Sequence, residues 1–474
     1  MQKTISNLQS SVSQTNRAPE ELQQDYLQQF ITDYNEHTKT SKKFTQNYRF
    51  TLADSRVPTG FNLALKEICY PIVAKKSFGS KIWDVDGNEY VDVTMGFGIN
   101  LFGHNPSFVK IALLEQLEQG IHLGPQTELA GEVAELIAEM TGMERVAFSN
   151  TGTEAVMAAI RIARAATKRN KIAIFSGSYH GHSDNTLVDA KEINGSLQIL
   201  PTASGVPPSI AEDVLVLDYG SPQSLELIEA YKHELAAVLV EPVQTSRLDL
   251  QPKEFLHKLR QLTTELDIAL IFDEMVTGFR IHPGGAQAWF GVAADIATYG
   301  KIVGGGLPIG VIAGKAAYMD KIDGGMWNYG DDSFPQVETT LFAGTHCKHP
   351  LSLAAAKAVL KYLKNQGATL QSNLNQRTAE FVNTLNAYLE AENIPVKMIN
   401  FGSIFGPNSG NSTTNSEKSL PLGFSLLTYH LINRGFLSRG GSGFLSTAHT
   451  DEDITYIIQA VKDSINDLRS GYFL

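Results

Sequence analysis

The pattern of apolar and polar positions changes along this chain, and the change predicts its layout. From about residue 130 onward, short apolar runs alternate with longer stretches in which apolar residues recur every three or four positions. Short apolar runs with polar flanks indicate buried strands, whereas the longer spacing indicates helices. The expected order is helix 130–141, strand 144–150, helix 153–167, strand 171–177, strand 236–242, helix 253–266 and strand 269–275. This alternation is typical of a largely parallel sheet covered by helices.

The N-terminal part follows other patterns. Residues 1–18 are rich in Ser, Gln, Asn and Thr and have little to bury, which predicts disorder or a linker. An amphipathic helix follows, with one face formed by Leu22, Tyr26, Leu27, Phe30 and Ile31. The polar run 37–49 is predicted to be a connector. Two short strands then flank Asp86-Gly87, a pair that favours a tight hairpin turn.

The C-terminal part begins with two predicted helices, 350–365 and 368–392, and continues with mixed strands and helices. The segment 406–419 is predicted to be a polar loop. The expected domains are a linker and helix over 1–49, an N-terminal segment of a small domain over 50–125, a large domain over 126–365 and the rest of the small domain over 366–474. A chain of 474 residues exceeds one typical core, in agreement with this division.

Composition narrows the function classes. The formal net charge of -11 disfavours a nucleic-acid partner, since phosphate binding needs a concentrated basic surface. Cys69 and Cys347 provide neither a disulfide framework nor metal-ligand spacing, which favours a reducing cytoplasm. The N-terminus lacks the apolar core of a signal peptide, and no run reaches the roughly 18 apolar residues of a membrane span. We therefore expect a soluble cytoplasmic enzyme with no metal site.

One acid and one lysine are the strongest candidates for chemistry. The apolar run ALIFDEM reaches Asp273, and KIVGGGLPIG presents Lys301 beside glycines. A pyridoxal phosphate (PLP) enzyme requires such a pair: an acid that keeps the pyridine nitrogen protonated and a lysine that forms a Schiff base. An acid at the end of a buried strand is also common in α/β proteins that have other chemistry.

Three further polar groups follow predicted strands. The segment SNTGTEA, residues 149–155, opens a helix, where backbone N–H groups bind phosphate; a simple N-cap is the equal alternative. After the next strand, Tyr179 is placed to stack on a flat ring, and its neighbour His180 is a poor metal candidate without a third ligand. Glu241 and Gln244 follow another strand. Groups at the ends of neighbouring strands predict one shared pocket.

In this order, the motifs SNTGTEA, GSYHGHSD, VLVEPVQ, IFDEMVTGFR, YGKIVGGGLPIG and FAGTHCKHP resemble the class III family of fold type I PLP-dependent aminotransferases. The segments FRIHPGGAQAWFGV and GFLSTAHT look most like its glutamate-1-semialdehyde aminomutase branch. The resemblance covers roughly residues 50–470. It implies an α/β fold: a large domain with a mostly parallel sheet sandwiched by helices, and a smaller α+β domain formed by the N- and C-terminal segments.

The resemblance also implies roles for single residues. Lys301 would carry the cofactor as an internal aldimine, Asp273 would pair with the pyridinium nitrogen, and Tyr179 would stack on the ring, all three counted as catalytic. The residues expected to bind the cofactor are Thr151, Gly152, Thr153, Tyr179, His180, Glu241, Gln244, Asp273, Met275, Lys301 and Thr345, with Gln244 near the ring hydroxyl and Met275 on the other ring face. Thr345 would reach the phosphate of the neighbouring subunit, which implies a homodimer with shared sites.

The N-terminal stretch looks like the aminotransferase domains of hybrid polyketide synthase and nonribosomal peptide synthetase enzymes. On that resemblance we expect an aminotransferase that takes an amino group from an amino acid donor. The acceptor would be a β-keto acyl thioester on an acyl carrier protein, and the chain would be an excised domain or a freestanding relative. The alternatives are an aminomutase, which isomerises one substrate, and a PLP-binding domain without turnover. Four side chains are open candidates for the substrate pocket: Arg280, Trp289, His346 and Arg439.

Overall fold

The computed structural model describes residues 18–55, 61–193, 195–408 and 422–474. These residues form two compact units. The first takes in the described residues up to Thr94, then 422–442 and 448–474, and the second takes in Met95 to 408 together with Gly443–Thr447. The predictions for residues 1–17 and for most of the polar loop 406–419 lie outside the described residues.

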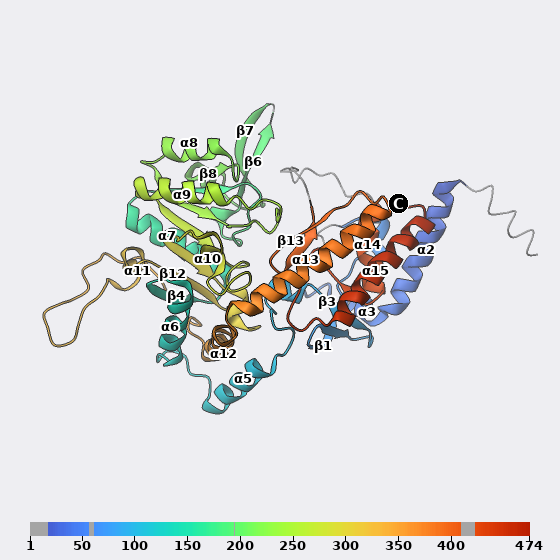
Figure 1. The fold of residues 1–474 in the computed structure, drawn as a ribbon, viewed down its shortest axis with the longest axis horizontal. Coiled ribbons are helices and arrows are strands. Elements are labelled where there is room, and N and C mark those ends of the chain that lie inside the picture. The colour runs from blue at the N-terminus through green and yellow to red at the C-terminus, as the bar shows by residue number, and fades with distance from the viewer. Residues whose placement is uncertain (1–17, 56–60, 194, 409–421) are drawn as a thin grey trace, which may run out of the picture. The chain divides into compact units, whose positions relative to one another are not determined.

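The second unit is built on a seven-stranded sheet, as far as the described residues show (Figure 1). The strand order is β4 (Arg145–Ser149), β12 (Gly310–Gly314), β11 (Ile296–Tyr299), β10 (Ala269–Asp273), β9 (Leu235–Val240), β5 (Lys171–Phe175) and β8 (Val214–Leu217). Strand β12 is antiparallel to both of its neighbours, and the other neighbouring strands are parallel. The predicted largely parallel sheet is confirmed, although β8, β11 and β12 were not individually predicted.

Helices cover both faces of this sheet. On one face lies α7 (Gly152–Thr167), an alanine-rich helix whose small residues such as Ala159 allow close packing on Leu239 and Ile271. On the other face lie α8 (Pro222–Ala230) and α9 (Lys253–Glu265), with the Phe255 ring edge-on to Phe175 of β5 at 5.8 Å (Figure 1). The predicted sandwich of helices around a sheet is therefore confirmed.

The rest of the second unit lies around this sandwich. Its helices are α4 (Met95–Gly98), α5 (Ser107–Gln119), α6 (Leu129–Thr141), α10 (Gly285–Phe290), α11 (Ala316–Asp323), α12 (Pro350–Gln366) and α13 (Ala368–Ala391). Its short 3-10 helices are η2 (Asp184–Thr186), η3 (Pro208–Asp213) and η4 (Lys301–Gly304). A hairpin joins β6 (Val188–Ile193) to β7 (Ser196–Pro201), and β13 (Met398–Phe401), β14 (Ile404–Pro407) and β16 (Gly443–Phe444) form a small antiparallel sheet. The predicted helices 130–141, 253–266, 350–365 and 368–392 agree with α6, α9, α12 and α13 within one residue at each end.

The first unit combines a four-stranded sheet with helices. Its strands lie in the order β1 (Ala74–Phe78), β2 (Lys81–Asp84), β3 (Glu89–Asp92) and β15 (Phe436–Leu437). Its helices are α2 (Pro19–His37), α3 (Lys39–Tyr48), α14 (Leu422–Asn433) and α15 (Asp451–Ser470), with the 3-10 helix η1 (Leu63–Ile68). Strands β2 and β3 are antiparallel around Gly87, whose φ of +95° suits glycine, so the predicted Asp86-Gly87 turn is confirmed.

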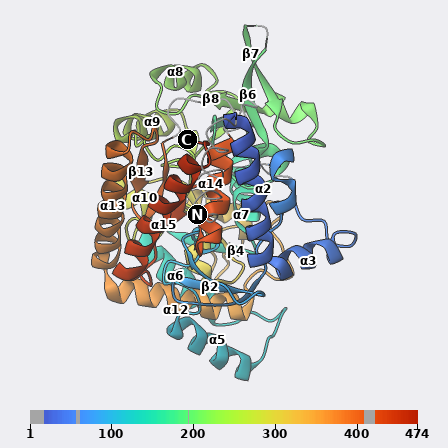
Figure 2. The same ribbon diagram turned by 90° about the vertical axis from the view of Figure 1, so that its right-hand side faces the viewer.

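Helix α2 is an integral part of the first unit. Its buried residues Phe30, Ile31 and Tyr34 pack in one cluster with Leu426 and Leu468. Figure 2 shows α2 beside α14. The predicted amphipathic helix is confirmed, and its apolar face belongs to the core of this unit.

The predicted connector 37–49 is wrong, because most of it forms α3. The Asp86 carboxylate, at the hairpin turn, accepts hydrogen bonds from the amides of Thr40 at 2.6 Å and Ser41 at 3.1 Å. These amides lie in the first turn of α3 and have no partner within the helix, so a carboxylate from a distant part of the sequence stabilises its start.

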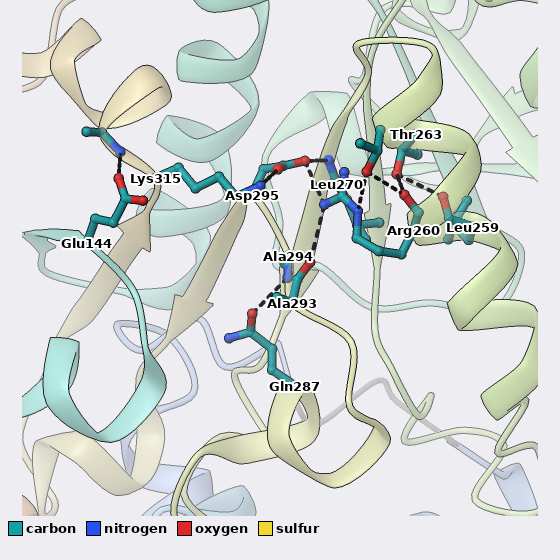
Figure 3. A network of polar contacts seen from close by, with 12 residues as sticks. Glu144, Leu259, Arg260, Thr263, Leu270, Gln287, Ala293, Ala294, Asp295 and Lys315 are labelled. Carbon is teal, nitrogen blue, oxygen red and sulfur yellow. Dashed lines mark hydrogen bonds and ion pairs between the residues drawn. The ribbon is translucent and has the colours of Figure 1, made fainter.

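The amino edge of the large sheet holds a closed polar network around Asp295, the residue before β11. Its carboxylate accepts hydrogen bonds from Lys315 Nζ at 2.7 Å, from Arg260 Nη1 at 2.9 Å and from the Leu270 amide at 2.8 Å (Figure 3). Asp295 is buried, and both cations keep some contact with solvent. This network joins β10, β11 and α9 at the edge where β10 begins.

None of the helices in the described residues is both long and apolar enough to cross a lipid bilayer.

Candidate active site

The opposite edge of the large sheet gathers the side chains singled out from the sequence. In the parallel register, Val240 lies beside Phe272 and Asp273 lies beside Thr298. Glu241, one residue past β9, therefore lies next to Asp273 at the end of β10, and Lys301 follows two residues after β11 ends. The same edge receives the turn after β5, which carries Tyr179 and His180. The structure thus brings the candidates from four strands together.

Asp273 is held in place by three partners. The residue is 4% exposed, and one carboxylate oxygen lies 2.8 Å from His180 Nδ1. The other oxygen accepts the Met275 amide at 3.1 Å and the Thr298 hydroxyl at 3.2 Å. His180 is also buried, and within the described residues its Nε2 atom has no hydrogen-bond partner. A buried polar atom without a partner is costly, which is a common mark of a functional site.

Glu241 is a second buried carboxyl beside Asp273. It accepts the Tyr179 amide at 3.0 Å. Burial raises the pKa of Glu241 to about 7, with a further rise from Asp273, while His180, the Tyr179 amide and Lys301 act in the opposite direction. Because burial disfavours the charged form of a carboxyl, the pKa of Glu241 lies near neutral pH.

The segment after β9 fastens the turn 176–180. Gln244 donates from Nε2 to the Ser176 carbonyl at 2.9 Å and to the Ser178 hydroxyl at 2.8 Å. Ser246 donates from its hydroxyl to the Gly177 carbonyl at 2.9 Å. Together with Glu241, these side chains hold the turn at four successive residues, 176–179. Tyr179 itself is 67% exposed, so its ring is accessible to a ligand.

The N-terminus of α7 lies at the same edge, where β4 ends. Thr151 is its N-cap, with φ -142°, and its hydroxyl accepts the Glu154 amide at 3.2 Å. The Glu154 carboxylate in turn accepts the Asn150 amide at 2.7 Å. The N-cap alternative is therefore correct in part, and the cap residue is Thr151. The start of this 16-residue helix also has the dipole and the amides that favour an anion.

Glycines let the backbone approach closely around this edge. A Cβ placed on Gly152 would lie 2.7 Å from Met275 Sδ, and one on Gly300 would lie 2.8 Å from the same atom. A Cβ on Gly310 would overlap the Thr151 carbonyl oxygen. Lys301 itself has φ +44°, a conformation that costs a non-glycine residue energy and that collects at functional sites. Met275 therefore packs between the helix start and the Lys301 turn.

Thr345 lies in a turn near the start of α7 of its own chain. The Cys347 amide donates to the Gly344 carbonyl at 3.2 Å, and a Cβ on Gly344 would lie 3.3 Å from the Asn150 side-chain nitrogen. The Thr345 side chain is exposed. Its predicted contact with a neighbouring subunit stays a prediction.

The role of Glu274 was not predicted from the sequence. This buried carboxyl accepts the amides of Ala286 at 2.7 Å and Gln287 at 2.9 Å, and the Thr277 hydroxyl at 2.7 Å. Burial raises the pKa of Glu274 to about 7. It fixes the start of α10 behind Asp273. The glycine pair Gly284-Gly285 at the start of α10 was the available signal, because a Cβ on Gly285 would overlap this carboxyl.

The open candidates for a substrate pocket divide between the units. Arg439 belongs to the first unit, and Arg280, Trp289 and His346 belong to the second. Arg280 is 1% exposed, donates to the Ser403 hydroxyl at 2.9 Å and to the Gly98 carbonyl, and lies over the Phe444 ring. Burial lowers its pKa to about 9. Arg280 is therefore an interior side chain that joins α4 to the small sheet.

The chain is similar to proteins named glutamate-1-semialdehyde 2,1-aminomutase. The protein of that name from Alkaliphilus oremlandii (strain OhILAs) is 35% identical over 443 residues, which cover 88% of this chain and 98% of the relative. Further relatives with this activity in their names are 34–37% identical. The expected transfer of an amino group to a carrier-bound β-keto acyl chain is therefore wrong. That expectation depended on an N-terminal likeness, and the relatives match nearly the whole chain.

Solved structures agree on the fold. An omega-transaminase from Sphaerobacter thermophilus superimposes with a TM-score of 0.80 at 27% identity, covering 90% of this chain and 98% of that chain. A structure described as a transaminase with PLP bound gives a TM-score of 0.78 at 25% identity, covering 92% and 99%. The fold is that of the fold type I PLP-dependent enzymes.

The edge described above fits PLP. It offers a buried acid, a lysine in the turn beyond the next strand, the start of a long helix for a phosphate, an exposed aromatic ring and glycines that leave room for close approach. The cofactor of this protein is pyridoxal phosphate. The family model for class-III aminotransferases matches residues 64–431, and the chain belongs to this family.

Proposed function

We propose that the chain is an aminomutase of the glutamate-1-semialdehyde 2,1 type, which moves an amino group between neighbouring carbons of one substrate. The observation that carries this proposal is the identity of 34–37% with relatives of that name, over 84–88% of this chain for the first three. Such an isomerisation needs no separate amino donor.

The proposed cofactor site follows the sheet edge. When bound, PLP withdraws electrons from the substrate carbon that loses a proton. Asp273 would accept a hydrogen bond from the protonated ring nitrogen, and its contacts with His180 and Thr298 keep its carboxylate oriented. A carboxylate has about four lone-pair directions, so these contacts leave room for the ring nitrogen.

The other residues would bind and orient. Thr151, Gly152 and Thr153 at the start of α7 would hold the phosphate. The open Tyr179 ring would stack on one face of the cofactor ring, and Met275 would cover the other face. Gln244 would lie beside the ring hydroxyl while its amide nitrogen holds the turn 176–180.

Lys301 would act as the general base and acid. Its ε-amino group would bind the cofactor and, when displaced by a substrate amine, would remove a proton at one substrate carbon and return it at another. The nearby carboxyl Glu241 and the conformation of Lys301 are the features that support this role.

We also propose that the active form is a homodimer. Helix α5 exposes Ile111, Leu114 and Leu117, each about half accessible in the single chain. An apolar face of this kind is typical of a protein interface. In that dimer Thr345 of a second copy would complete the phosphate site. Sedimentation at several protein concentrations tests the assembly, and a monomer at all of them would contradict it.

Incubation with glutamate-1-semialdehyde alone tests the proposed function. The expected result is conversion to the isomer with the amino group on the neighbouring carbon, followed by NMR, with no added donor. The matched control is Lys301→Ala, which keeps the fold and loses the base. If the semialdehyde stays unchanged while amino groups from added amino acids reach keto acceptors, the protein is a transaminase and the proposal is wrong.

A further inference from the structure

We propose that Glu241 is a positioning residue, which sets the His180 ring against Asp273 by accepting the Tyr179 amide. The inference rests on the proposed PLP site but on no particular substrate. Different side chains hold the two parts of the turn 176–180. Gln244 and Ser246 hold its outer part, residues 176–178, whereas Glu241 holds the amide of Tyr179, next to His180.

The geometry links Glu241 to Asp273 through one residue of backbone. The Tyr179 amide nitrogen lies 3.0 Å from Glu241, and the next residue places His180 Nδ1 at 2.8 Å from Asp273. Glu241 and Asp273 themselves lie at the ends of neighbouring parallel strands, each one residue after the pair Val240 and Phe272. The turn is therefore fixed at two adjacent strand ends. The hydrogen bond from the Tyr179 amide to Glu241 sets the position from which the next residue, His180, reaches Asp273.

The residue after the turn, Gly181, has a conformation and a close contact that favour glycine. Its φ is +86°, and a Cβ there would lie 2.5 Å from the Thr153 hydroxyl of α7. The turn is thus packed against the start of α7 immediately after His180. A shift of Tyr179 and His180 would disturb both Asp273 and the proposed phosphate site, which makes a displaced turn costly for cofactor binding.

The protonation of Glu241 gives the contact a pH dependence. The groups that face it are the Tyr179 amide and His180 from the turn, Asp273 from the end of β10 and Lys301 from the turn after β11. The buried Tyr219, which follows β8, also interacts with it. An ionised carboxylate accepts an amide hydrogen bond more strongly than a protonated one. The hydrogen bond from the Tyr179 amide to Glu241 therefore becomes stronger as pH rises through about 7.

The test measures PLP binding without any substrate, so it is independent of the aminomutase proposal. Glu241→Ala removes the acceptor, Glu241→Gln keeps an oxygen acceptor without the charge, and Ser246→Ala is the matched control on the outer part of the same turn. Titration with PLP is followed by the absorption of the bound cofactor between pH 6 and 8. His180 ring nitrogens are followed by NMR in the cofactor-loaded protein.

We expect the PLP dissociation constant to rise at least tenfold in Glu241→Ala and less than threefold in Glu241→Gln and Ser246→Ala. The absorption change of the wild type near pH 7 should be absent in Glu241→Gln, and the His180 signals should shift or broaden only in Glu241→Ala. If Glu241→Ala binds PLP as the wild type does with unchanged His180 signals, the proposal fails. It also fails if Glu241→Gln is as weak as Glu241→Ala. Should Glu241→Ala not fold, a Glu241→Gln protein that keeps the wild-type pH change contradicts it.

Discussion

The two edges of the large sheet bury carboxylates in opposite ways. At the amino edge Asp295 is matched by two cations and a backbone amide, as Figure 3 shows. At the carboxyl edge, Asp273 contacts the imidazole of His180, and Glu241 lies beside it. Burial raises the pKa of Glu241 to about 7. The Nε2 atom of His180 has no hydrogen-bond partner among the described residues.

The difference separates a structural network from a chemical one. Among the described residues, the Asp295 carboxylate has its partners within the protein alone, so it needs no ligand. The Asp273 edge keeps polar groups whose needs are not fully met, and a bound cofactor would complete them. Perturbed carboxyls collected in one place are typical of an active site.

Replacing one lysine at each edge by alanine tests the difference between the edges most strongly. Lys301→Ala should lower turnover at least about a thousandfold, because it removes the proposed base, while thermal stability changes little. Lys315→Ala should leave turnover within about twofold and lower stability by less than about 1 kcal/mol, since its side chain is half exposed. Turnover and thermal melts check both variants. Loss of turnover in Lys315→Ala would contradict the separation of the two edges.

The buried aspartates of the two edges should differ in what their substitution changes: stability for Asp295 and turnover for Asp273. Asp295→Asn should destabilise the fold by about 2–3 kcal/mol, below the 3–5 typical of a fully buried pair because Arg260 and Lys315 keep solvent contact. Asp273→Asn should reduce turnover at least about a hundredfold with little change in stability. Urea unfolding and turnover are the measurements. Equal stability losses in both variants would mean that the edges do not differ as described.

Gly152→Ala probes the space at the start of α7. The new Cβ would meet Met275 Sδ at 2.7 Å, so Met275 or the helix start must shift. We expect PLP affinity to fall about tenfold, roughly the 1.4 kcal/mol of one decade. The double variant Gly152→Ala with Met275→Ala should regain part of this loss. Unchanged affinity in the single variant would place the phosphate away from this helix.

The smallest expected effect is a pH slope of stability in the cofactor-free protein. The folded pKa of Glu241 and Glu274 is raised from 4.5 to about 7, so the folded state binds more protons than the unfolded state between these values. Their contribution is fully present below about 4.5 and is lost as pH rises through about 7. Glu241→Gln should reduce this slope, measured by urea unfolding at several pH values. A slope that is unchanged in Glu241→Gln would show that Glu241 does not titrate there.

The sequence was sufficient for the parallel sheet, for the helices that cover it and for the candidates Asp273 and Lys301, because each lies in a strong local pattern. The contacts that complete the site were not predictable in this way. The pairing of His180 with Asp273 joins residues 93 positions apart, and the support of α3 by Asp86 joins residues about 45 apart. Such pairs depend on strand register and on the packing of turns, which local composition does not encode.

Strand β12 has one more consequence, for the tether that carries Lys301. Because β12 is antiparallel to β11, with Tyr299 beside Val311, residues 300–309 leave the sheet edge and return to it. Within this short loop, the Val303 amide donates to the Gly300 carbonyl and the Leu307 amide donates to the Gly304 carbonyl. A tether closed at both ends has few alternative paths, so little chain entropy is lost when the lysine takes its working position. Residues inserted between Lys301 and Gly310 would add freedom to the lysine without touching any side chain of the site.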